Sequence, residues 1–156
     1  MEISFEKAME QDAADLIKVL DLSFRDDFIR FGECPGYEVP IEAMKKRIRD
    51  SFQYKIVLGA RIIGNISVRA KGENRYWLGC LAVIPEFQNQ GIGTKAIEFI
   101  ENEFPDAISW GLDTPIQKTE NCYFYEKMGF TGTRDEVHSG KVTLRIFEKK
   151  MERSIA

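Results

Sequence analysis

The chain has 156 residues, of which 44% are hydrophobic and 12% aromatic, so it is long enough to bury one sizeable core. Acidic residues outnumber basic ones by 25 to 22 without any block of Lys or Arg, which argues against a nucleic-acid partner. The cysteines Cys34, Cys80 and Cys122 form no C-x-x-C pair, and with the single His138 they are too sparse for a zinc site, so no metal is expected. The N-terminus has no apolar signal region and no apolar run approaches the roughly 20 residues of a membrane helix. We therefore expect a reduced, soluble, cytoplasmic protein without a membrane partner.

The hydrophobic pattern predicts alternating strands and helices in the order β-α-α-β-β-β-α-β-α-β-β. The first helix carries one apolar stripe, formed by Ala13, Ile17, Leu20, Phe24 and Phe28. The strand at 76–84 is nearly all apolar, as expected of a central strand covered on both faces. No repeat or linker interrupts the chain, so we expect one mixed α/β domain over residues 1–156. The predicted ranges are 2–7, 10–28, 41–52, 54–58, 61–70, 76–84, 91–104, 107–112, 121–128, 130–137 and 141–149.

A turn between the apolar strand and the following helix is the most informative segment. It contains Gly91 and Gly93, which have no side chains and let a bulky anion approach the backbone closely. Free N–H groups and the positive end of the helix dipole face outward there, which suits a phosphate or pyrophosphate. Gln88 and Asn89 add amide donors, and the Thr94 hydroxyl could reach a phosphate oxygen. A tight strand-to-helix turn with no ligand is the alternative for an isolated G-x-G.

Two other nucleotide-binding turns fit less well. A dinucleotide fingerprint requires G-x-G-x-x-G, and Ala96 occupies the third glycine position; an alanine is sometimes allowed there, but no acidic residue follows at the end of a parallel strand. A Walker loop requires Gly-Lys-Ser/Thr, whereas Thr94 and Lys95 stand in the reverse order after Gly93, with no earlier Gly in register.

The segment Q-N-Q-G-I-G at residues 88–93 resembles the Q/R-x-x-G-x-G/A signature of the GNAT superfamily of N-acetyltransferases. The preceding V-I-P-E-F at 83–87 is similar to the V-x-P-E-[YF] that commonly stands before it, and the predicted order of elements agrees over the whole chain. The resemblance implies a central mixed sheet, splayed around a coenzyme A cleft and flanked by helices. It also implies that acetyl-CoA is the cosubstrate and that two protomers could share a sheet edge as a homodimer.

By the same resemblance, backbone amides in the turn hold the pyrophosphate of coenzyme A, and strand backbone binds the pantetheine arm and the acetyl carbonyl. An N–H group aimed at the thioester carbonyl would stabilise the oxyanion of a tetrahedral intermediate. The implied pyrophosphate amides are those of Gln90, Gly91, Gly93 and Thr94, and the implied pantetheine strand is Leu81, Ala82 and Val83.

A second motif, N-C-Y-F-Y-E-K-M-G-F at 121–130, taken alone reads as a short amphipathic helix with a Gly C-cap. Beside the turn it resembles the N-x-x-F-Y-E-K-x-G-F segment of the same superfamily. The resemblance makes Tyr125 the general acid, since a phenol with a pKa near 10 stays protonated at neutral pH and can donate to a departing thiolate. The alternative is that Tyr125 only positions or packs against the sulfur. Many members place the Asn seven residues before the Tyr, where this chain has Lys118, so Asn121 either contacts the cofactor or caps the helix.

The general base is not identified by the sequence. Some superfamily members carry a Glu early in the strand before the turn, and Tyr76 holds that place here. Glu73, Asp113 and His138 are nearby options, and a water chain to solvent is another.

The acceptor is expected to bind between the first two helices and the sheet, beside the loop at 31–40. Glu33, Glu38, Asp26 and Asp27 could attract a cationic amine there, with Tyr37 as a wall, although ordinary solvated charges are the simpler interpretation.

The sequence therefore predicts an acetyltransferase that moves the acetyl group of acetyl-CoA to a small-molecule or peptide amine by direct attack. The alternative is a non-catalytic acyl-CoA-binding sensor or interaction module on the same fold.

Overall fold

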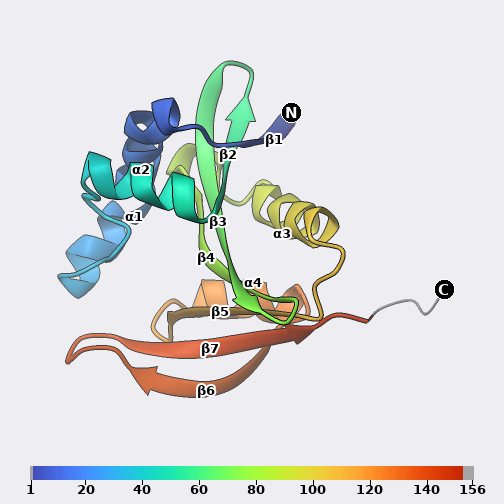
Figure 1. The fold of residues 1–156 in the computed structure, drawn as a ribbon. Coiled ribbons are helices and arrows are strands. Elements are labelled where there is room, and N and C mark those ends of the chain that lie inside the picture. Colours follow the sequence, from blue (N-terminus) through green and yellow to red (C-terminus); the bar gives the residue numbers. More distant parts are fainter. Residues whose placement is uncertain (1, 153–156) are drawn as a thin grey trace.

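The computed structural model describes residues 2–152, which form helices around one seven-stranded sheet of strand order β1-β2-β3-β4-β5-β7-β6 (Figure 1). All neighbouring strands in it are antiparallel except β4 and β5, which are parallel. The elements are β1 Ile3–Lys7, η1 Glu10–Asp12 (a 3-10 turn), α1 Ala13–Phe31, α2 Ile41–Asp50, β2 Phe52–Leu58, β3 Arg61–Gly72, β4 Arg75–Val83, η2 Pro85–Phe87 (a 3-10 turn), α3 Ile92–Glu103, β5 Ser109–Pro115, α4 Thr119–Lys127, β6 Thr131–Val137 and β7 Thr143–Lys150.

The predicted mixed α/β class and order of elements are confirmed, with boundaries that differ by a few residues. The apolar stripe predicted for the first helix is wrong at its C-terminal end. Phe28 is 39% exposed and stacks on Tyr37 at 4.7 Å between ring centroids, whereas Phe31 is buried. In the first half of α1, Leu16 and Val19 are buried with Leu20, because the helix packs along β3 and β4.

Two apolar clusters fill the interior, one on each side of the sheet. The larger one joins the sheet to α3 and α4 and contains Trp110, Phe147 and Ile97, each with at most 1% of its surface exposed. The smaller one lies under α1 and α2 and contains Leu16 and Met44, both fully buried. The central strands are covered on both faces, which accounts for the apolar run that the sequence shows in β4.

The pairing of β4 with β5 is short. Only three positions match, from Arg75 opposite Ser109 to Trp77 opposite Gly111. Beyond them the two strands part, and the rest of β4 keeps only its β3 partner. We call this the β4–β5 divergence. It divides the sheet into a half with β1 to β4 and a half with β5, β7 and β6.

A β-bulge at Gly79 shifts the alternation of β4 side chains between the two faces of the sheet. Cys80 pairs with Ser67 and Leu78 pairs with Val68, so Gly79 is an extra residue between consecutive β3 partners. Before the bulge, Leu78 belongs to the cluster on the α3 side; after it, Leu81 faces that cluster while Cys80 packs on the α1 side. Because side chains alternate along a strand, one inserted residue exchanges the two faces.

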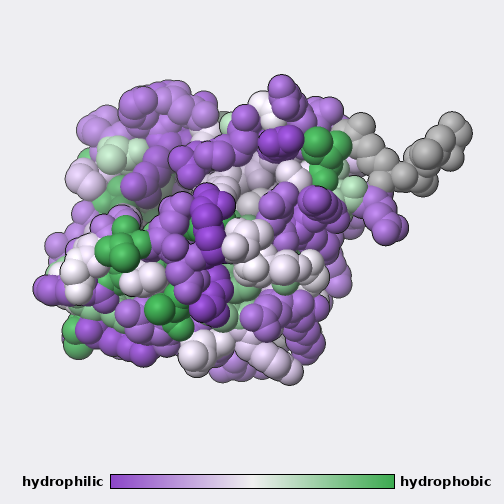
Figure 2. Space-filling model, turned by 90° about the horizontal axis from the view of Figure 1, so that it is seen from below, coloured by the Kyte–Doolittle hydropathy of each residue, from purple (hydrophilic) through white to green (hydrophobic). Residues whose placement is uncertain are grey.

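The outer strand β6 is exposed at every residue, with Val137 81% exposed. Seen from below Figure 1, the surface is mainly hydrophilic and its hydrophobic residues form separate small patches (Figure 2). Within residues 2–152, no helix combines the length and the apolar character needed to cross a membrane.

Candidate functional site

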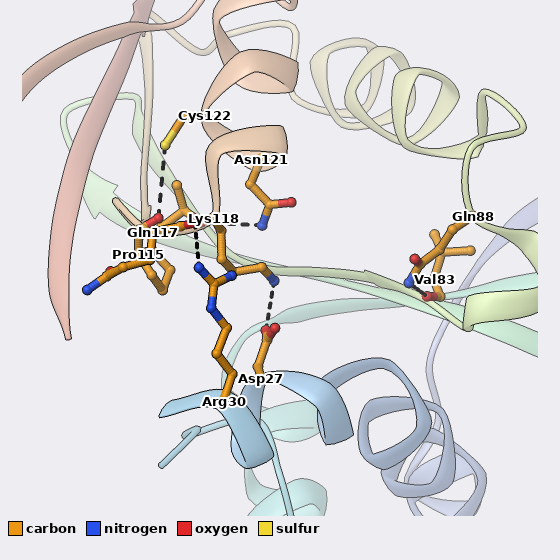
Figure 3. A network of polar contacts seen from close by, with 10 residues as sticks. Asp27, Arg30, Val83, Gln88, Pro115, Gln117, Lys118, Asn121 and Cys122 are labelled. Atoms are coloured by element: carbon orange, nitrogen blue, oxygen red, sulfur yellow. Dashed lines mark hydrogen bonds and ion pairs between the residues drawn. The ribbon is translucent and has the colours of Figure 1, made fainter. Parts of the chain in front are cut away.

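Hydrogen bonds from its own polar groups fix the backbone of the turn that leads from β4 into α3. After β4 ends, the N–H of Ile84 donates to the carbonyl of Ile63 at 3.0 Å, which anchors the turn to the sheet. The Gln88 side-chain amide reaches back to the Val83 carbonyl at 2.8 Å (Figure 3), and the Gln90 side-chain amide donates to the Glu86 carbonyl at 3.2 Å. Both carboxamides therefore brace the turn, and the exposed Asn89 adopts a positive φ of 61°.

The start of α3 presents free backbone donors. Lys95 is the first residue whose N–H bonds back along this helix, to the carbonyl of Gly91 at 3.2 Å. Within residues 2–152, the N–H groups of Gln90, Gly91, Gly93 and Thr94 have no hydrogen-bond partner. Free donors at the positive end of a helix dipole are suited to an anion.

A side chain is disfavoured at Gly91 and at Gly93 for different physical reasons. Gly91 has φ of +81°, which side-chain-bearing residues seldom adopt, and the space where its Cβ would stand is empty within 4 Å. A Cβ on Gly93 would instead stand 3.1 Å from the Phe124 ring. Gly91 therefore shapes the turn and leaves it open, and Gly93 lets α3 approach α4.

The backbone of Leu81, Ala82 and Val83 lies beyond the last β4–β5 pair, so these residues form the unpaired side of the divergence. The Ala82 side chain is buried under α1 and α2, while those of Leu81 and Val83 contact the cluster on the α3 side. A polar, extended ligand could add to this free strand edge by backbone hydrogen bonds.

Tyr125 lies on α4 and is 92% buried against Phe124, Phe130 and Phe147. Its hydroxyl forms no hydrogen bond with any residue that the structure describes. Burial, followed by the nearby Cys80 and Asp113, raises the pKa of Tyr125 far above that of a free phenol. The phenol is therefore protonated at neutral pH, and its electrostatic interaction with Cys80 places it near β4.

Asn121 is in the first turn of α4, whose N-cap is Lys118, so it does not cap the helix. Its side-chain amide donates to the Thr114 hydroxyl of β5 at 3.3 Å (Figure 3). This bond fixes α4 against β5, and Cys122 adds a 4.0 Å contact from its sulfur to the Pro115 carbonyl.

Of the carboxylates that the sequence offers as a base, Asp113 lies closest to the site. It is exposed and stands past the part of β5 that pairs with β4, and within residues 2–152 its carboxylate forms no hydrogen bond or ion pair. Desolvation raises the pKa of Asp113, and the charges of His138 and Arg69 partly oppose this. Glu73 instead lies in the β3–β4 turn with φ of +56°.

Other polar groups that the sequence singles out serve the fold. The Tyr76 hydroxyl donates to Asp106 at 3.2 Å, and its ring stacks on Trp110 at 5.3 Å, on the α3 side. Asp27 forms an ion pair with Lys118 at 2.7 Å, and Glu33 accepts a hydrogen bond from the Ser139 hydroxyl. Asp27 and Glu33 are therefore occupied in contacts within the chain.

Two features of this site were missed by the sequence reasoning. The bulge had a signal, an isolated Gly79 inside an apolar strand, which is typical of a bulge. The Asp27–Lys118 contact had none, because its partners are 91 residues apart. Within residues 2–152, no group of three or more His, Cys, Asp or Glu side chains is placed to hold a metal ion.

The fold and the turn together describe a mixed α/β protein whose central sheet opens beside the N-terminus of a helix. Residues 52–132, just over half of the chain, match the family model described as "Acetyltransferase (GNAT) domain". The chain therefore belongs to the GNAT family of acetyltransferases, and the resemblance drawn from the sequence is confirmed. A relative, the uncharacterized protein YrkN of Bacillus subtilis (strain 168), is 31% identical over 137 residues, which cover 82% of this chain and 72% of YrkN.

Solved structures agree in fold. The PaiA N-acetyltransferase of Thermoplasma acidophilum in complex with coenzyme A matches with a TM-score of 0.81 and 22% identity, over 97% of this chain and 100% of that one. The ribosomal-protein-S18-alanine N-acetyltransferase of Escherichia coli matches with a TM-score of 0.80 and 11% identity, over 98% and 96% of the two chains. At these identities the likeness concerns the fold alone.

Proposed function

We propose that this protein binds acetyl-CoA along the free edge of β4 and transfers the acetyl group to an amine. The observation that carries the proposal is the continuity of two features: the unpaired backbone at Leu81, Ala82 and Val83 leads directly into the free amides of Gln90, Gly91, Gly93 and Thr94. The strand edge suits the amide-containing pantetheine arm, and the helix N-terminus suits the diphosphate. The match to PaiA, whose structure contains coenzyme A, supports this assignment.

The proposed reaction is direct. The neutral amine nitrogen attacks the thioester carbonyl carbon, and the carbonyl oxygen becomes an oxyanion next to the N–H groups of β4. Collapse re-forms the carbonyl and breaks the C–S bond, and the nitrogen releases its extra proton to solvent. Tyr125 gives its proton to the departing sulfur. Burial raises the pKa of Tyr125, which keeps the phenol protonated as a hydrogen-bond donor to the sulfur but makes it a weaker acid than an ordinary phenol. The proton is therefore transferred only once the sulfur carries the full thiolate charge, and solvent then returns a proton to the phenolate.

An ammonium acceptor must lose a proton before it attacks, and we assign this proton to Asp113. The carboxylate lies past the parallel pair, on the rim of the divergence, and near enough to Tyr125 to raise the pKa of that phenol. Its own raised pKa makes it a better proton acceptor than an ordinary Asp. The charge of His138, in the β6–β7 turn, lowers the pKa of Asp113 and partly opposes this effect.

The test is a thiol-release assay with acetyl-CoA and a panel of amines, amino acids, polyamines and peptide N-termini. We expect sustained turnover on at least one acceptor and a fall in kcat of about a hundredfold in Tyr125→Phe, the loss typical of a removed acid. Tyr123→Phe is the matched control, because Tyr123 stands on the same helix but is 70% exposed. Tight binding of acetyl-CoA without turnover on any acceptor would instead indicate the non-catalytic binding module.

A further inference from the structure

On the α1 side of the β4–β5 divergence, polar contacts join the two halves of the sheet. α1 packs on β3 and β4 in the first half, whereas α4 follows β5 in the second. Between them, Asp27 of α1 contacts Lys118 at the start of α4, and Arg30 donates to the Gln117 carbonyl at 3.1 Å (Figure 3). The sequence separation of these partners, 91 and 87 residues, shows that they join distant parts of the chain.

The Asp27–Lys118 contact is the most shielded of these. Its oxygen and nitrogen are 2.7 Å apart, and the two side chains are only 19% and 16% exposed. The Lys118 ammonium also lies 6.0 Å from the centre of the Phe24 ring, so an anion and an aromatic face hold it together. A pair that is mostly removed from water is screened less by salt than an exposed pair and has a more fixed geometry.

The position of Lys118 gives this pair a role beyond stability. Lys118 is the N-cap of α4, the nine-residue helix that carries Tyr125. A helix is a rigid rod over this length, so whatever fixes Lys118 also fixes the Tyr125 hydroxyl relative to β4. The other contacts of α4 described above, from Asn121 and Cys122, join it to β5 in its own half. The ion pair is thus a polar tie from the N-terminal end of α4 to the half that contains β4. The C-terminal end of α4 is held separately by Lys149, which donates to the Met128 carbonyl and pairs with Glu101 of α3.

We propose that Asp27 and Lys118 are positioning residues, which hold the Tyr125 hydroxyl at the β4 edge by fastening α4 to α1 across the divergence. This inference rests on the proposed function, since it gives Tyr125 a task at that edge. A displacement of about 1 Å at a reacting group costs up to a hundredfold in rate. Loss of the pair therefore lowers kcat through Tyr125 and leaves the phosphate-binding turn, which belongs to the first half, unchanged.

The experiment compares Lys118→Met with Lys118→Arg, each alone and combined with Tyr125→Phe. We expect Lys118→Met to lower kcat by at least about tenfold, with the Kd for acetyl-CoA unchanged within about twofold, and Lys118→Arg to retain most of the activity. In the Tyr125→Phe background, Lys118→Met should have no further effect, because both changes remove the same contribution. A purely structural role would instead give equal losses in both backgrounds.

Lys55→Met is the matched control, because the Lys55–Asp12 pair is as shielded, at 18% and 11% exposed, and lies wholly in the first half. An equal loss of kcat in Lys55→Met, or full activity in Lys118→Met, would overturn the proposal. If the wild-type protein turns over no acceptor, the proposed function fails. Amide hydrogen exchange then tests separately whether the Asp27–Lys118 pair fastens α4 to α1. Lys118→Met must then speed exchange in α4 and leave α3 unchanged, and unchanged exchange in α4 refutes the inference.

Discussion

Asp113 and Asp135 are two surface carboxylates with opposite electrostatic settings. Asp135 accepts two hydrogen bonds from the Arg145 guanidinium, at 2.8 and 3.1 Å, which lowers its pKa. Asp113 has no such partner within residues 2–152, and desolvation raises its pKa. A carboxylate held ionised by an arginine is a structural group, whereas one left without a counter-ion and inclined to accept a proton is typical of a functional site.

This difference predicts opposite effects of the same substitution on stability. A raised pKa in the folded state means that Asp113 favours folding while protonated, and that this contribution is lost as pH rises through its folded pKa. Asp113→Asn keeps the neutral form, so it should raise Tm at neutral pH by on the order of 1–2 °C and lose the advantage below the ordinary Asp pKa, about 3.9.

Asp135 has a lowered pKa, so its contribution is present above the unfolded pKa and is lost as pH falls through the folded one. Asp135→Asn should therefore lower Tm at neutral pH.

Enzyme activity also distinguishes the two substitutions: Asp113→Asn should reduce kcat/KM by about a hundredfold, and Asp135→Asn should not. Thermal unfolding at several pH values and steady-state kinetics check both. A lower Tm in Asp113→Asn at neutral pH would contradict the argument.

At the scale of elements, the sequence predicted most of what positions the site. The glycines of the turn and the apolar strand before it predicted a helix N-terminus with free amides, because these are local properties of the backbone. The splayed sheet was expected only through the family resemblance and is confirmed. The local pattern could not predict where β4 and β5 part, since strand pairing depends on residues far apart such as Trp77 and Gly111. Nor could it predict that Gln88 would brace the turn through the Val83 carbonyl, since side-chain partners are chosen only in the folded chain.

The bulge in β4 makes a strong prediction about this element. Deletion of Gly79 would restore regular alternation and turn Leu81 and Val83 toward α1, away from the cluster they contact. We expect a loss of more than about 4 kcal/mol in unfolding free energy, measured by urea denaturation.

The control is Gly79→Ala, which keeps the extra residue. Gly79 has no positive φ, and its added Cβ would meet the Ser67 hydroxyl at 3.1 Å and, in ordinary van der Waals contact, the Ser67 carbonyl oxygen at 3.7 Å. The cost should stay within about 1 kcal/mol. If the deletion lowered the unfolding free energy as little as this substitution, the bulge would not determine which face of the sheet the later β4 side chains occupy.

At the scale of the whole molecule, binding of the cofactor should appear as added stability. A ligand at about 100 times its Kd stabilises the folded state by about 2.7 kcal/mol, which raises Tm by about 5–10 °C for a chain of this size. We expect this shift with acetyl-CoA in a thermal-unfolding assay. Gly91→Asp should abolish it, because a carboxylate at the free amides repels the diphosphate and competes for the donors.

Gly59→Asp provides the matched control. Gly59 also has a positive φ, of +62°, and also has no atom within 4 Å of the place of its Cβ, but it lies in the β2–β3 turn. Both substitutions impose similar backbone strain, so both should lower the Tm of the free protein. Only Gly91→Asp should remove the response to acetyl-CoA, and an equal response in the two variants would place the diphosphate elsewhere.

The parallel pair between β4 and β5 has a consequence for how the chain can vary. The residues proposed to hold the pantetheine arm and the diphosphate lie before residue 95, and the proton donor lies after residue 119. Three residue pairs, between Arg75–Trp77 and Ser109–Gly111, join β4 to β5. Separate stretches of the gene therefore encode the residues proposed to bind the nucleotide and those proposed to transfer protons. Mutation can therefore change the stretch after residue 109 while the stretch that binds the nucleotide is inherited unchanged.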